Sequence, residues 1–283
     1  MADFTTTESA QFLLTVWANK VEEFRRRSLI FTGITTMASE YGVGSVRGFQ
    51  TLKIPTTTLL NSGTARQKSE SSNITYDSNI DTAFTLTIDQ HWYQADNVEE
   101  FGDALAGFDA MGLYAPALVE SVVRKEDATL AAIVDDFTNQ TVGALAQPNT
   151  EGEITRAIQY LDDSDHPQNG RAWAFSNPGT LALGQQTRFS SRDFTSATPV
   201  DTGSVPRLYD IPVHRSTAIE GSNAAGHDNA LVHRSWAVHH RVGNRPRTRT
   251  FSDIDSFSER MAVSQIWGNA RLRTTAAVWV KGP

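Results

Sequence analysis

Four histidines, His227, His233, His239 and His240, are the residues whose type is best suited to hold a metal ion. On a strand, His233 and His239 would share one face but lie about 20 Å apart at ~3.3 Å per residue. On a helix they would be separated by about 1.7 turns and would point to different sides. Because neither spacing converges on one ion, the histidines are predicted to be structural, with a metal site as the less favoured alternative.

Clustered carboxylates are the next candidates for chemistry. Asp162, Asp163 and Asp165 lack the further ligands and the terminal glutamate of an EF-hand, so we expect solvated loop carboxylates there. The acidic pairs at 99–100 and 135–136 are adjacent in sequence, which would place the two groups on different sides of a helix. The sequence has no P-loop, no GxGxxG after a strand and no GxSxG. We therefore expect neither a cofactor nor enzymatic activity; an unrecognised histidine-centred enzyme is the alternative.

The composition is that of an ordinary globular protein, with 39% hydrophobic and 20% charged residues. A chain of 283 residues can form one large or two modest domains with real cores. No apolar run approaches the ~18 residues of a membrane span, and the first residues do not have the pattern of a signal peptide. Cysteine is absent, which excludes disulfides and thiolate zinc sites.

Negative charge is concentrated between Asp77 and Asp136, where 13 acidic residues stand against Arg124 and Lys125 alone. A protein that grips DNA through its phosphates would show a basic stripe instead. The segment is therefore interpreted either as a solvated helix face or as a surface that tolerates nearby DNA without binding it.

The N-terminal half predicts a helix, a polar extension and a second, longer helix. Residues 8–27 have helical apolar spacing, follow a capping-box pattern and end in three arginines. Residues 33–83 are rich in Gly, Ser, Thr and Asn, which indicates a two-stranded extension with no core of its own. A strand is expected at 84–89, a short helix opened by Asp96 at 97–109, and a long helix begun by Pro116 at 116–141.

The C-terminal half alternates between helices and strands. Thr150 and Glu153 form a capping box before a helix, residues 171–175 alternate as a strand, and Asn177 with Pro178 begins a further helix. Residues 208–213 are expected to be extended, 257–267 to form a helix ended by Gly268, and 270–280 to form a closing strand. Because there is no regular βαβ period, the fold class is α+β.

The order of these elements, together with four short segments, resembles a known family. The segments are Phe84–Asp89, Arg171–Pro178, Leu208–Val213 and Ile266–Gly268. They are similar to the major capsid proteins of tailed bacteriophages, which have the Hong Kong 97-like fold, although Asp210 stands where glycine is usual. The resemblance implies an N-terminal arm at 1–45, an extended β-loop at 46–90, a peripheral domain with a long spine helix at 91–149 and 256–283, and an axial domain at 150–255.

The resemblance implies a structural protein that self-assembles as hexamers and pentamers of an icosahedral shell enclosing double-stranded DNA. Its partners would be other copies of itself, a portal protein, and separate scaffolding or decoration proteins where these exist. It would be assembled in the host cytoplasm, reside in the virion and need no membrane. The acidic segment would then face the packaged DNA. A nanocompartment (encapsulin-like) shell of the same fold, loaded with an enzyme cargo, is the alternative.

Some members of this family join subunits by a lysine–asparagine isopeptide bond. Lys53 and Lys68 lie on the expected loop and Asn269 near the C-terminus, but no motif fixes a pairing, so an uncrosslinked shell is expected. The residues expected to contact neighbouring subunits lie on the arm and the extended loop: Trp17, Arg25, Arg26, Arg27, Lys53, Asn61, Arg66, Lys68 and Glu70.

Overall fold

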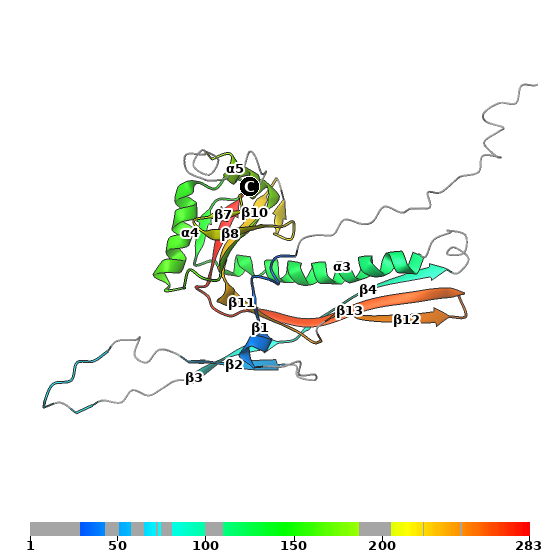
Figure 1. The fold of residues 1–283 in the computed structure, drawn as a ribbon, viewed down its shortest axis with the longest axis horizontal. Coiled ribbons are helices and arrows are strands. Elements are labelled where there is room, and N and C mark those ends of the chain that lie inside the picture. Colours follow the sequence, from blue (N-terminus) through cyan, green and yellow to red (C-terminus); the bar gives the residue numbers. More distant parts are fainter. Residues whose placement is uncertain are drawn as a thin grey trace, which may run out of the picture.

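The computed structural model describes residues 29–42, 51–57, 65–71, 73–74, 81–99, 110–186, 205–222, 224–243 and 245–283. The helix expected at 8–27 lies outside these residues. Figure 1 shows three parts: a compact end, an elongated layer in which one long helix covers a sheet, and a thin two-stranded extension. The mixture of helices and strands confirms the α+β class.

The compact end is built on a seven-stranded sheet with the order β5-β14-β10-β6-β8-β7, to which β9 adds beside β10. The strands are β5 (Thr141–Gly143), β6 (Arg171–Phe175), β7 (Arg207–Leu208), β8 (Ile211–Arg215), β9 (Gly221–Ser222), β10 (Gly226–His233) and β14 (Ala277–Gly282). Every residue of β6 is buried, because the sheet is covered on both faces by the two hydrophobic clusters described next.

One face of this sheet packs against two short helices, α4 (Glu151–Asp163) and α5 (Asn177–Gly184). The capping box of Thr150 and Glu153 is confirmed: Thr150 Oγ1 accepts from Glu153 N, and Glu153 accepts from Thr150 N. At α5 the cap is Ser176, one residue before the expected position, and its hydroxyl accepts from the N–H of Gly179. These caps satisfy backbone donors that would otherwise lack partners at each helix start.

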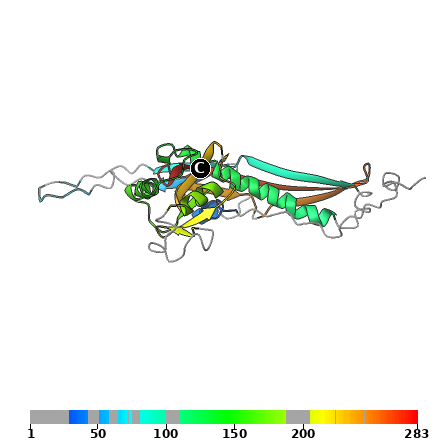
Figure 2. The same ribbon diagram turned by 90° about the horizontal axis from the view of Figure 1, so that it is seen from above.

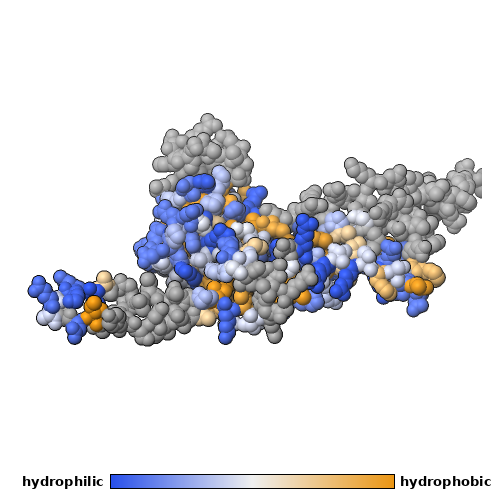
Figure 3. Space-filling model, turned by 60° about the horizontal axis from the view of Figure 1, so that its bottom comes forward, coloured by the Kyte–Doolittle hydropathy of each residue, from blue (hydrophilic) through white to orange (hydrophobic). Residues whose placement is uncertain are grey.

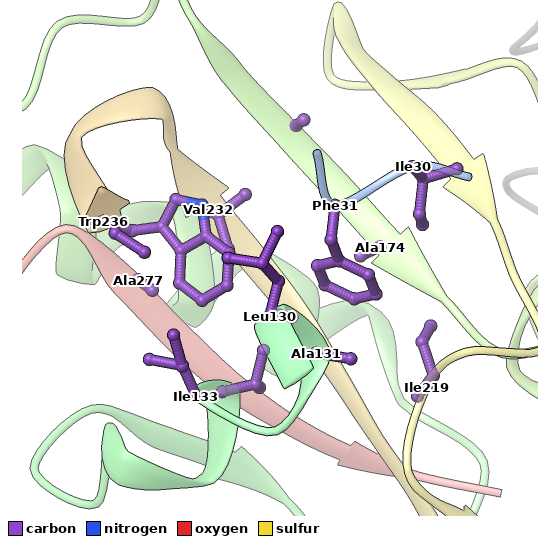
Figure 4. Packing of buried hydrophobic residues seen from close by; sticks show 14 of the residues in the cluster. Ile30, Phe31, Leu130, Ala131, Ile133, Ala174, Ile219, Val232, Trp236 and Ala277 are labelled. Carbon is purple, nitrogen blue, oxygen red and sulfur yellow. The ribbon is translucent and has the colours of Figure 1, made fainter. Parts of the chain in front are cut away.

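The other face packs against residues drawn from distant parts of the chain. Figure 4 shows Ile30 and Phe31 from the N-terminal segment gathered with Leu130 from the end of the long helix and Trp236. The rings of Phe31 and Trp236 lie 6.2 Å apart. Burial of these large side chains, worth roughly 1.5–3 kcal/mol each, attaches the N-terminal segment and the helix end to the sheet.

The elongated layer consists of helix α3 (Ala110–Ala131) on a second sheet with the order β1-β11-β13-β12, with β4 pairing the free side of β13. Its strands are β1 (Thr36–Met37), β4 (Gln90–Glu99), β11 (Ala237–Arg241), β12 (Arg247–Asp253) and β13 (Ser258–Arg271). A short 3-10 turn, η5 (Arg234–Trp236), connects β10 to β11. Figure 2 shows α3 running along this sheet, and Leu118 and Val122 of the helix pack on Met261, Val263 and Trp267.

The helix expected at 257–267 is wrong, because this segment is the first part of strand β13. Its buried residues recur every second position, at 261, 263, 265 and 267, which is the period of a strand with one covered face. Gly268 does not end a helix either. A Cβ at this position would lie 2.3 Å from the backbone oxygen of Thr87. Glycine is therefore needed at this point of β13, where the backbone of residues 87 and 88 passes close to the strand.

The long helix also differs from expectation at both ends. It begins at Ala110, six residues before Pro116, and it ends at Ala131. The rest of the stretch expected to be helical contains the 3-10 turn η4 (Val134–Asp136) and ends where strand β5 begins. The short helix expected to open at Asp96 is wrong at its start, since β4 continues to Glu99 through ten pairs with β13; residues 100–109 lie outside the described residues.

The extension starts as a two-stranded sheet of β2 (Thr51–Thr57) and β3 (Asp81–Thr87), paired antiparallel over seven positions. Its base has more apolar surface than expected: Ile54 and Leu86 are buried with Ala38 and Val238. Ala38 belongs to the 3-10 turn η2 (Ala38–Tyr41). The extension is therefore anchored to the molecule at its base, and Figure 1 shows residues 65–71 at its far end.

The expected domain boundaries remain a prediction. Each of the two large sheets, however, combines strands from both the expected peripheral and the expected axial domain. Strands β11 and β12 fall within 150–255 and pair with β13, in the layer under α3. Strand β14 falls within 256–283 and pairs with β10, in the compact end.

Candidate intersubunit surfaces and the buried charge cluster

A buried group of charges joins the C-terminal end of α3 to β11. Glu126 accepts a hydrogen bond from Arg241 Nε at 2.5 Å, and His239 Nε2 lies 3.5 Å from the same carboxylate oxygen. Burial raises the pKa of Glu126 above its usual value, although the hydrogen bond and the charge of Arg241 oppose the rise. A buried carboxylate of this kind depends on its cation, so the pair fixes how the helix meets the sheet.

Asp127, the next residue, holds the N-terminal segment. Its Oδ1 accepts from the backbone N–H groups of Phe31 at 2.9 Å and Thr32 at 3.3 Å. Carboxylates near a helix C-terminus are disfavoured by the helix dipole. Both carboxylates have compensating partners: Glu126 is bound by Arg241 of β11, and Asp127 is bound by the backbone N–H groups of the turn at residues 31–32.

The four histidines do not converge on one point, although His239 and His240 are adjacent in β11. His227 Nδ1 lies 2.9 Å from the carbonyl oxygen of Pro283, and His233 stacks on His166 with ring centroids 5.2 Å apart. Burial, followed by the charges of Arg241 and His240, lowers the pKa of His239 to about 4, so this ring is neutral at pH 7. Within the described parts of the chain, no three His, Cys, Asp or Glu side chains are grouped so that they could hold a metal.

The acidic groups considered above have separate structural roles. Asp162 pairs at 2.6 Å with Arg171, whose side chain is 1% exposed. Burial, and then the charge of Asp136, raises the pKa of Asp135. Glu99 ends β4, whereas Glu100 lies outside the described residues.

The acidic segment 77–136 does not form one charged face in its described portion. Glu126 and Asp127 are buried, and Glu120 pairs with Arg124 at 2.9 Å along the helix. Exposed carboxylates remain at Asp89 before β4, at Asp96 and Glu99 in β4, and at Asp135 and Asp136 in η4. Any surface facing DNA would therefore carry fewer of these charges than the sequence count indicated.

The expected intersubunit residues fall on the extension where they are described. Lys53 is exposed on β2, on the face opposite Ile54. Arg66, Lys68 and Glu70 are exposed at the far end of the extension. Trp17, Arg25, Arg26, Arg27 and Asn61 lie outside the described residues. Asn269, the asparagine considered for a crosslink, lies in β13 opposite His239.

No helix within the described segments has the length and apolar character needed to cross a membrane.

No family model matches this sequence, and no curated protein does either. Solved structures match over nearly the whole chain. A structure from Mycobacterium phage Che8 is 17% identical with a TM-score of 0.79, covering 95% of this chain and 97% of that one. The capsid structure of the cyanophage P-SCSP1u is 15% identical with a TM-score of 0.77, covering 99% of this chain and 96% of that one.

A third match, the capsid of a native gene transfer agent (GTA) particle, is 12% identical with a TM-score of 0.72 and covers 99% of both chains. At these identities the similarity establishes the fold alone. The chain therefore has the fold of phage capsid structures, which confirms the fold inferred from the order of its elements.

Proposed function

We propose that this chain is the major capsid protein of a tailed phage, a structural subunit that self-assembles into an icosahedral shell. The observation that carries the proposal is the similarity over 95–99% of the chain to solved structures of phage capsids and of a gene-transfer-agent capsid. Because the similarity extends from end to end, the long extension and the helix-covered sheet are included in it.

The shape of the subunit supports the same proposal. The extension projects away from the compact end (Figure 1), and its far residues 65–71 are all exposed. A thin arm of polar residues buries little surface of its own, so it is useful only when it packs on another molecule. A repeated subunit supplies such a contact at every symmetry-related position.

The finer parts of the proposal concern the contents and partners of the shell. The subunits would form hexamers and pentamers around double-stranded DNA, with a portal protein and separate scaffolding or decoration proteins where present. Assembly would take place in the host cytoplasm, and the mature protein would reside in the virion.

Expression of the full chain followed by negative-stain electron microscopy tests the main proposal. Uniform closed particles are the expected result, and a protein that remains monomeric at all concentrations would contradict it. Nucleic acid and protein contents of particles isolated from the native source then distinguish DNA packaging from a nanocompartment with an enzyme cargo.

A further inference from the structure

The turn between β12 and β13 ends the elongated layer in a group of exposed apolar side chains, which we call the apolar tip. It consists of Phe251, Ile254 and Phe257, which are 67%, 81% and 69% exposed. Figure 3 shows hydrophobic atoms gathered at this end of the molecule. Single exposed apolar residues are common on protein surfaces, but three of them within seven residues at one end indicate a contact site.

Hydrogen bonds hold the apolar tip in one shape. Asp253 accepts from the N–H of Asp255 at 3.2 Å and from the hydroxyl of Ser256 at 2.8 Å, and it pairs with Arg260 at 2.5 Å. Phe257 has a positive φ of 44°, a costly conformation for a bulky residue that persists only when its surroundings fix it. A preorganised tip loses little entropy when it binds.

A groove between α3 and β4 offers a matching surface. It has a volume of about 640 Å³, and its lining includes Trp92, Ala117, Val122 and Ala128. Among the described residues β4 pairs with β13 only, so its outer edge borders the groove with backbone groups that have no strand partner. Trp92 itself is 40% exposed there.

The apolar tip and the groove also differ in charge. Asp255 and Glu259 are exposed beside the tip. The groove has Lys125 above the Trp92 ring at 4.4 Å, while the neighbouring Arg124 pairs at 2.9 Å with Glu120, which also lines the groove. Opposite charges flanking two apolar surfaces would orient one against the other.

One chain cannot bring these two surfaces together. At the tip Ser258 pairs with Glu99, whereas beside the groove Gln265 pairs with Trp92. These pairs are seven residues apart along β13, which is about 23 Å at ~3.3 Å per residue. The tip can therefore fill only the groove of another molecule.

We propose that the apolar tip of one subunit inserts into the α3–β4 groove of a second copy of this chain. Two different patches meet in such a contact, so repetition generates a closed ring when the rotation between subunits permits it. The inference rests on the proposed function, to which it adds a specific intersubunit contact distinct from the extension.

Cysteine crosslinking tests the contact directly, because the chain has no cysteine of its own. The double variant Ile254→Cys/Ser121→Cys places one thiol on the tip and one on an exposed residue of the groove. Treatment of assembled particles with a short bifunctional maleimide should give a ladder of covalent oligomers, and neither single-cysteine variant should give more than dimers. A double variant without a ladder would overturn the inference.

A second pair of cysteines tests whether the extension, and not the tip, occupies the groove. If Ser69→Cys/Ser121→Cys gives the ladder while the tip pair gives none, the extension fills the groove and the proposal is wrong. If wild-type protein forms no particles, the proposed function fails separately. The same crosslinking on concentrated unassembled subunits then decides the tip contact by the presence or absence of covalent oligomers.

Substitutions measure the strength of the contact. Ile254→Asp/Phe257→Asp should weaken it by more than about 100-fold, the change expected when two large apolar side chains lose their burial; Ile254→Leu is the matched control. Charge reversal by Lys125→Glu should impair particle formation, and Glu259→Lys in the same chain should restore it. Failure of this restoration, together with wild-type assembly of the tip variant, would refute the proposal.

Discussion

Replacing Arg241 by methionine tests whether the buried Glu126–Arg241 pair holds α3 on the sheet. The glutamate side chain is 2% exposed and the arginine side chain 24% exposed, so the substitution leaves a buried carboxylate without its cation. Breaking a buried pair in this way costs roughly 3–5 kcal/mol. Because Arg241 retains some contact with solvent, we expect a loss near the lower limit, about 3 kcal/mol.

For a chain of this length, that loss corresponds to a fall in Tm of about 5 °C. Urea and thermal denaturation of the unassembled full-length subunit measure it. The double variant Glu126→Gln/Arg241→Met removes the buried charge as well as its partner, so it should recover most of the loss. His239 lies close to the same carboxylate but is neutral at pH 7 in the wild-type protein, since its pKa is about 4; the charge that balances Glu126 there is therefore that of Arg241.

The pH dependence gives the prediction a second readout. The folded-state pKa of Glu126 lies above its usual 4.5, so the folded state binds the extra proton between the two values and stability falls as pH rises through that window. Without Arg241 the window extends further upward. The loss of stability caused by Arg241→Met should therefore shrink as the pH is lowered toward 4.5. Equal deficits in the single and double variants at every pH would refute the reasoning.

Four further predictions concern packing, assembly and chemistry. Gly268→Ala should destabilise the subunit by about 1–3 kcal/mol in denaturation experiments, since the new Cβ would overlap the Thr87 oxygen. Gly42→Ala is the control, because a Cβ at that glycine meets no other atom and adds only the backbone strain of its positive φ. Deletion of residues 61–70 should leave a folded subunit that forms no regular particles by electron microscopy, and uniform shells from the deleted protein would argue against the extension as an intersubunit contact. Boiling particles in detergent should release one band near 31.1 kDa; a covalent ladder would point to Lys53 or Lys68. Elemental analysis should find no stoichiometric transition metal, and one ion per subunit would show that the histidines are not purely structural.

Local signals in the sequence predicted the elements that are determined locally. The capping box at Thr150 and Glu153 was predictable, because its hydrogen bonds join residues only three apart. Strand β6 and the helix after it were predictable for a similar reason. The segment 258–271 was not, because its alternation of buried residues also includes helix-compatible spacings and its sheet partners are distant in sequence.

The buried charges and the proposed contact site gave weaker signals. Glu126 and Asp127 are both buried, which the charged character of these residues in the sequence does not indicate. The sequence does not show that the apolar tip is exposed, because Phe251 and Phe257 have the character of core residues. Only the pairing of β12 with β13 places them at the end of the layer. Exposure of an aromatic residue is a property of the fold, and periodicity alone does not reveal it.

The distribution of packed side chains separates folding from assembly. The two large clusters, which contain Phe31, Trp173 and Trp236, lie in the compact end, whereas the cluster under α3 comprises five buried residues among those that the structure describes. Substitutions in the large clusters should therefore unfold the subunit before they affect assembly. In the elongated layer and the extension the ratio of exposed surface to core is high, so substitutions at exposed residues such as Ile254 should leave the fold intact and change only what the subunit contacts. This difference makes the tip and the extension the places where assembly can be altered without loss of the subunit, and it allows their separate contributions to be measured in one protein.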